Sequence, residues 1–167
     1  MDSKASARKL YYQDAIQVWE GFCQLHKDLF DLSCEEYLTL LASDIDKLET
    51  MLPVKEEIIA KIGELEGERA ELIEKINASG YFDIDVKRAG DLLTAFADLE
   101  SQSGISALKN LNALLIDMIQ KIQEQNKKNQ MFLNRAMRSI NELKAGFGGK
   151  KVYTTYGADG MTRQLNR

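Results

Sequence analysis

The chain has 167 residues, of which 44% are hydrophobic, enough for one domain with a sizeable core. Leu, Ile, Lys, Glu and Ala are abundant, there is one proline, and strand-like alternation is absent, so we expect an all-α protein. The net charge of −4 gives no polybasic surface for nucleic acid, and no apolar run reaches the ~18 residues of a membrane span.

The first predicted helix begins near Leu10 and ends at about Ala42. Its apolar side chains recur at three- and four-residue spacing without losing register, which favours one long helix. Cys23 and His26 lie on one face of it as a potential metal pair, but two further ligands are missing, so a structural role is favoured. The bulkiest side chains of this face are expected in the core: Trp19, Phe22, Phe30 and Tyr37.

Asp44 is the predicted N-cap of a second helix, which runs to a stop at Gly80. Pro53 predicts a kink or short break, because proline removes one backbone hydrogen bond and clashes one turn back. Gly63 and Gly67 lie in the helix interior. Either they allow a neighbouring helix to approach closely or they are merely tolerated, and the second alternative is favoured.

A shorter helix is predicted over about Val86 to Leu99, followed by a loop from Glu100 to Gly104. Ser103 is a plausible N-cap for the last helix, which we expect from Ile105 to Ala145. At 1.5 Å per residue this helix would be roughly 60 Å long, far longer than a compact domain needs.

The last helix changes character midway, where Gln125, Asn126 and Asn129 replace aliphatic residues on its apolar face. Two interpretations stay open. Either buried amides fix the register of a helix seam, or the bundle ends here and the helix continues beyond its partners. In the second case an apolar strip would be exposed and would seek a partner helix or cargo. The strip would then consist of Phe132, Leu133, Met137, Ile140 and Leu143.

The chain therefore divides into a predicted helical domain, residues 1–145, and a predicted flexible tail, residues 146–167. From Lys144 onward five cations oppose one anion, so the tail is +4 on a chain of −4. It has too few aliphatic residues to fold alone. Tyr153 and Tyr156 on this glycine-rich tether are candidate docking residues.

We predict an antiparallel bundle or coiled coil of three long helices plus one short helix. The scattered carboxylates fit helix caps and turns, and the glycine–lysine segment at 146–151 lacks the strand and helix that flank a phosphate-binding loop. We therefore expect no enzyme, no catalytic residue, no metal, no cofactor and no small-molecule substrate. The function must be binding.

Three stretches together resemble the FlgN-type flagellar export chaperones. Residues 41–49 resemble the turn between the family's first two helices, and residues 55–72, with a Leu-Glu-x-x-Arg element, resemble its second helix. Residues 126–140 and 156–160 resemble its Asn-rich segment, final amphipathic helix and terminal Tyr-x-x-x-Gly.

This resemblance implies a cytoplasmic chaperone of the flagellar type III export system. Such proteins bind the C-terminal helical segments of hook–filament junction (hook-associated) proteins, prevent their premature assembly and deliver them to the membrane export gate. On this basis the cargo groove involves the strip from Phe132 to Leu143, and Tyr153 and Tyr156 are candidates for docking to the export gate protein. The rival hypothesis is a structural coiled coil whose long helices form a homodimer and bind no cargo.

Overall fold

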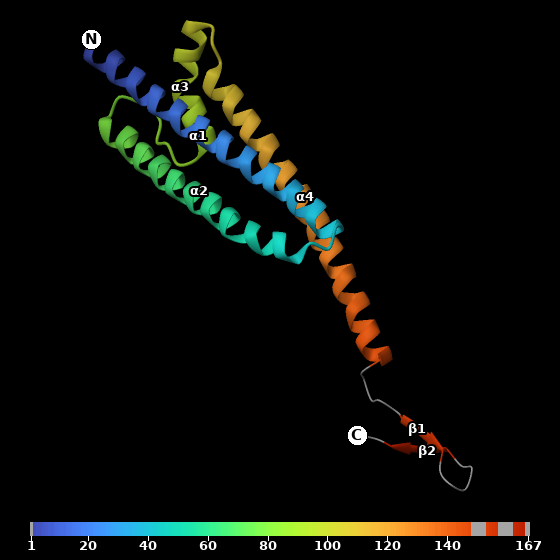
Figure 1. The fold of residues 1–167 in the computed structure, drawn as a ribbon. Coiled ribbons are helices and arrows are strands. Elements are labelled where there is room, and N and C mark those ends of the chain that lie inside the picture. Colours follow the sequence, from blue (N-terminus) through green and yellow to red (C-terminus); the bar gives the residue numbers. More distant parts are fainter. Residues whose placement is uncertain (1, 148–152, 157–161, 166–167) are drawn as a thin grey trace. The chain divides into compact units, whose positions relative to one another are not determined.

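The computed structural model describes residues 2–147, 153–156 and 162–165. Four helices follow in chain order: α1 (Asp2–Leu41), α2 (Ile45–Ser79), α3 (Ala89–Ser103) and α4 (Ala107–Phe147) (Figure 1). Two short strands follow, β1 (Tyr153–Tyr156) and β2 (Thr162–Leu165). The prediction of an all-helical fold with three long helices and one short helix is therefore confirmed. The chain forms two compact units, Met1–Lys127 and Lys128–Arg167.

In the first unit α1 and α2 lie side by side and antiparallel, joined by a tight turn (Figure 1). The first part of α4 runs parallel to α1 (Figure 1). The indole N–H of Trp19 donates to Asn112 Oδ1 at 3.0 Å, and 15 residues further along α1 the Cys34 thiol lies 3.9 Å from Gln125 Oε1. Between them, the Cys23 thiol donates to the Leu111 carbonyl at 3.4 Å.

The core of this unit is built around Trp19 and Phe22, each 1% exposed. Their rings meet edge to face, 6.1 Å apart at 85°, a favoured geometry for aromatic pairs. The predicted core positions Phe30 and Tyr37 are only half-buried. Further large buried side chains come from α2, the α2–α3 connection, α3 and α4, among them Leu72, Ile76, Val86, Leu92, Phe96 and Leu108.

Helix α1 begins at Asp2, so the predicted start near Leu10 was wrong. The first residues lack an apolar period, but Arg8 anchors them to α3. Its guanidinium donates to the Ala95 carbonyl at 3.2 Å and to Asp98 Oδ1 at 2.8 Å, and it lies 5.0 Å from the centre of the Phe82 ring. Contacts this distant in sequence hold the first turns of the helix.

The Arg8–Asp98 pair makes stability depend on pH. The hydrogen bond from Arg8 lowers the pKa of Asp98. The pair therefore contributes to the free energy of unfolding above the carboxyl's unfolded pKa, and this contribution is lost as pH falls through the folded pKa. Asp98→Asn should lower the free energy of unfolding at pH 7 by about 0.5 kcal/mol, as for a partly exposed pair. Urea unfolding should show the difference shrinking as pH falls below the carboxyl's unfolded pKa of ~3.9. A difference unchanged over that range would contradict this role.

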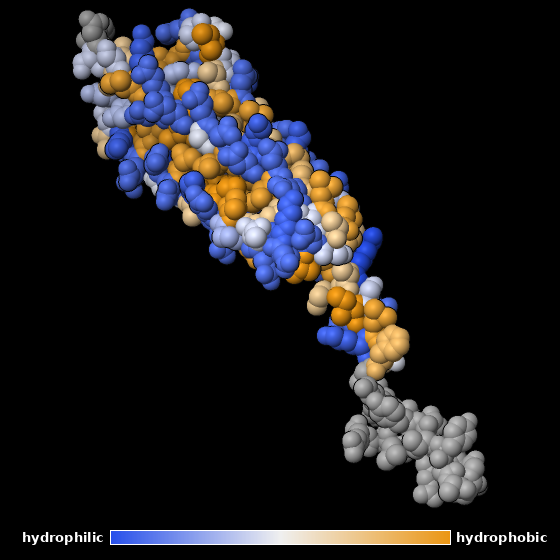
Figure 2. Space-filling model, viewed as in Figure 1, coloured by the Kyte–Doolittle hydropathy of each residue, from blue (hydrophilic) through white to orange (hydrophobic). Residues whose placement is uncertain are grey.

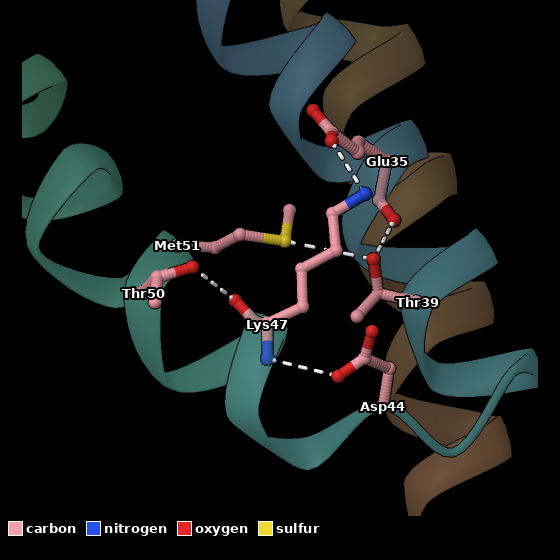
Figure 3. Close-up of polar contacts among 6 residues, drawn as sticks. All are labelled: Glu35, Thr39, Asp44, Lys47, Thr50 and Met51. Carbon is pink, nitrogen blue, oxygen red and sulfur yellow. Dashed lines mark hydrogen bonds and ion pairs between the residues drawn. The ribbon is translucent and has the colours of Figure 1, made fainter.

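The α1–α2 turn is held by side chains from both helices (Figure 3). Asp44 Oδ1 accepts the Lys47 amide at 3.0 Å, which confirms the predicted N-cap. The Lys47 ammonium pairs with Glu35 of α1 at 3.0 Å, and the Thr39 hydroxyl lies 3.6 Å from Met51 Sδ. Ser43 takes a positive φ of 54°, which lets the chain reverse within three residues.

Helix α2 continues through Pro53 as one helix, so the predicted break is absent. Around Gly63 and Gly67 no described atom beyond the helix's own backbone lies within 4 Å of an added Cβ, so within the described residues neither glycine allows a close approach. The close approach occurs instead at Gly21 of α1, where an added Cβ would meet Leu65 Cδ1 at 2.9 Å. The sequence analysis did not single out Gly21.

Helix α3 begins at Ala89, three residues after the predicted Val86. Asn77 holds the backbone of Val86 outside the helix by two hydrogen bonds of 2.9 Å, one to its carbonyl and one from its amide. Asp91 then accepts the amides of residues 87 and 88, which caps the helix and lowers the pKa of that carboxyl. The helix extends to Ser103 and ends at Gly104, whose φ is 69°.

Glu100, predicted in a loop, is a helical residue that joins three helices. Its Oε1 accepts the Tyr12 hydroxyl at 2.9 Å and the Leu108 amide at 2.6 Å, and so caps the start of α4. Burial of the Tyr12 hydroxyl raises its pKa, and the hydrogen bond to Glu100 is the second largest cause of the increase. Ser103 ends α3 and is not the N-cap of α4, so that prediction was wrong.

In the tail, β1 and β2 pair antiparallel, with Tyr153 opposite Leu165 and Tyr156 opposite Thr162. The sequence analysis did not predict these strands. Residues 148–152, 157–161 and 166–167 lie outside the described residues, so the flexible tail and the boundary at residue 145 stay predictions.

Candidate helix-binding surface

The last five turns of α4, in the second unit, carry a strip of exposed apolar side chains on one side of the helix. Figure 2 shows hydrophobic residues gathered on this part of the chain. We call the following residues, with their exposed fractions, the distal α4 strip: Leu133 (37%), Met137 (56%), Ile140 (46%), Leu143 (58%) and Phe147 (79%).

The strip follows the geometry of a coiled-coil seam. Leu133, Met137, Ile140 and Phe147 fall at spacings of four, three and seven residues, and Lys144 fills the remaining seam position. Residues at these spacings lie one above another along a helix. The arrangement therefore offers one continuous ridge to a second helix, with a single cation near its C-terminal end.

Four of the five predicted strip residues are exposed, whereas Phe132 is half-buried. Phe132 lies about 100° around the helix from Leu133, on the edge of the strip. Phe147 extends the ridge and was not among the predicted strip residues, because the helix runs two residues beyond the predicted end at Ala145. A count of helical spacing past that end would have found it.

The amides upstream of the strip differ from one another in exposure. Asn129 is buried and Gln125 is half-buried, whereas Asn126 is exposed. The Gln125 side chain accepts a long contact, 3.9 Å, from the Cys34 thiol of α1. Gln125 therefore lies at the contact between α4 and α1. Exposed apolar residues of α4 occur both before these amides, at Leu114, Ile116 and Ile119, and after them, in the distal α4 strip.

Cys23 and His26, the candidate metal pair, form contacts that stabilise the fold. His26 Nδ1 lies 2.7 Å from the Phe22 carbonyl one turn back, and Cys23 donates to the Leu111 carbonyl. Burial, aided by Glu20, raises the pKa of the Cys23 thiol and keeps it protonated. Within the described part of the chain, no three His, Cys, Asp or Glu side chains are grouped to hold a metal ion.

None of the described helices combines the length and the apolar character needed to cross a membrane. Tyr153 and Tyr156, the predicted docking residues, lie in β1. Backbone pairing places both of them in a two-stranded ladder, and the structure leaves their docking role a prediction.

A helical bundle whose longest helix ends in an exposed coiled-coil ridge is typical of proteins that bind other helices. The profile of the FlgN protein family matches residues 11–164, and the chain belongs to this family. It is thus a flagellar export chaperone, of a non-enzymatic family whose cargo is hook-associated proteins. Comparison with curated proteins and with solved structures gave no match.

Proposed function

We propose that this chain is a cytoplasmic chaperone that binds the C-terminal helical segment of a hook–filament junction protein along the distal α4 strip. The observation that carries the proposal is the exposure of Met137, Ile140 and Leu143 on one side of α4. Fully burying such side chains stabilises a contact by about 1.5–3 kcal/mol each. A cargo helix laid against the ridge gains this stabilisation and cannot assemble prematurely.

Titration calorimetry of the full chain with a C-terminal helical fragment of a junction protein tests this function. We expect one fragment per chain, micromolar or tighter affinity and a negative heat-capacity change, the marker of apolar burial. Failure to bind at about 100 µM would overturn the proposed cargo.

We further propose that the tail docks on the export gate protein through Tyr153 and Tyr156. The tail is basic, and an extended segment with aromatic side chains suits recognition at a groove or sheet edge. The helical ridge and the tail would then serve different partners.

Truncation after Phe147 should leave cargo affinity within about twofold, because the whole strip is retained, and should abolish gate binding. Calorimetry measures the first effect, and a pull-down with the cytoplasmic domain of the gate protein measures the second. The double variant Tyr153→Ala, Tyr156→Ala is the finer probe of the same site. Loss of cargo binding on truncation would assign the tail to the cargo site instead.

A further inference from the structure

The outward face of α2 carries a second line of exposed aliphatic side chains. Ile45, Leu52 and Ile59 are 61%, 58% and 52% exposed. Their spacing of seven residues places them on one line along the helix. One turn further along, at Gly63, the surroundings are open as well. We call Ile45, Leu52 and Ile59 the α2 line.

The two apolar surfaces lie in oppositely charged surroundings. Helix α2 has nine acidic and five basic side chains, a net charge of −4. Residues 128–147 of α4 have four basic and one acidic side chain, a net charge of +3. The asymmetry extends to the whole chain, since residues 1–127 have 24 acidic and 14 basic side chains (−10) and residues 128–167 have two and eight (+6).

Individual charges follow the same pattern. Glu49 and Glu56 each lie four residues after a member of the α2 line, and neither forms an ion pair with another described residue. In the distal α4 strip the seam position between Ile140 and Phe147 is held by Lys144. An ammonium in the seam is suited to a partner helix that carries carboxylates beside its apolar line.

We propose that, without cargo, two copies of this chain associate head to tail, the distal α4 strip of one copy packing on the α2 line of the other. Each surface spans 15 residues, Leu133 to Phe147 and Ile45 to Ile59, or about 21 Å of helix. Pairing α2 with α2, or α4 with α4, would bring like charges together, which electrostatics disfavours. The opposite charges of the two surfaces therefore favour a contact between α4 of one copy and α2 of the other over a contact between identical surfaces.

Each such contact covers the strip of one copy until cargo arrives. This inference rests on the proposed function, because it assumes that cargo binds the same strip. A cargo helix and a second copy then compete for Met137 and Ile140, so cargo dissociates the assembly. The association itself is measured on the chain alone, so its failure and the failure of cargo binding are distinguishable.

Sedimentation velocity of the full chain from about 1 to about 100 µM tests the proposal. We expect association that increases with concentration and weakens at least about tenfold between low and ~0.5 M salt. Leu52→Lys with Ile59→Lys, and separately Met137→Glu with Ile140→Glu, should each prevent it. Val54→Lys and Met131→Glu are matched controls, since both residues are 47% exposed and lie on the other side of their helices.

Mixing the two double variants identifies the contact. Each retains the surface that the other has lost, so an equimolar mixture should form a heterodimer although neither variant associates alone. A chain that stays monomeric at all concentrations overturns the proposal. Association that survives either double variant, or is not restored by mixing, overturns it as well, because a like-with-like contact would then be responsible.

Discussion

Replacing Met137 and Ile140 together by glutamate should weaken cargo binding at least about 100-fold and leave the helical bundle folded. Both side chains are exposed, 56% and 46%, so the folded chain loses no internal packing. In the complex the variant no longer buries two apolar side chains, each of which stabilises the contact by about 1.5–3 kcal/mol. It also places two carboxylates in a helix seam, where their desolvation is unfavourable. Titration calorimetry with the cargo fragment measures the effect.

Met131→Glu is the control for this variant. Met131 is an exposed methionine of the same helix, about 160° around it from Leu133 and therefore off the strip. Its replacement should change cargo affinity less than threefold. Circular dichroism should be the same for all three proteins, and a loss of helical signal in the double variant would show that the strip supports the fold.

Trp19→Ala should produce the largest loss of stability, about 3–5 kcal/mol. The indole is 1% exposed, packs edge to face on Phe22, and donates its N–H to Asn112 of α4. The alanine variant leaves a cavity and orphans the Asn112 amide oxygen. Urea unfolding monitored by circular dichroism measures the difference in free energy.

Trp19→Phe separates the two contributions. A phenyl ring fills much of the cavity but cannot donate to Asn112, so its loss should be smaller, about 1–3 kcal/mol. If alanine and phenylalanine destabilise equally, the hydrogen bond and not the packing anchors α1 to α4. A loss below 1 kcal/mol for alanine would contradict the assignment of Trp19 to the core.

Local signals predicted much of the fold. Asp44 caps the N-terminus of α2 with its side chain, and Gly80 ends the helix in the left-handed conformation, as predicted for both residues. Helical spacing of the apolar residues predicted the long α4. Glu100 could not be predicted, because its partners Tyr12 and Leu108 become neighbours only after the bundle forms. The early start of α1 depends likewise on Arg8 reaching Asp98, 90 residues away.

The candidate site was predictable as a pattern but not as a surface. Spacing places Leu133, Met137 and Ile140 on one side of α4, but burial depends on neighbours that spacing does not specify. Phe132 shows this limit, because it shares the pattern and is half-buried. The strand β1 had an overlooked local signal, since Tyr153–Tyr156 consists of aromatic and β-branched residues.

Hydrogen–deuterium exchange, with and without the cargo fragment, tests the central claim that the exposed end of α4 binds cargo. Without cargo, and at a chain concentration too low for self-association, the amides of residues 131–147 should exchange quickly, as in a helix with one apolar side exposed. Saturating fragment should slow these amides most within the chain. Unchanged exchange over residues 131–147, with protection elsewhere in the chain, would contradict the account.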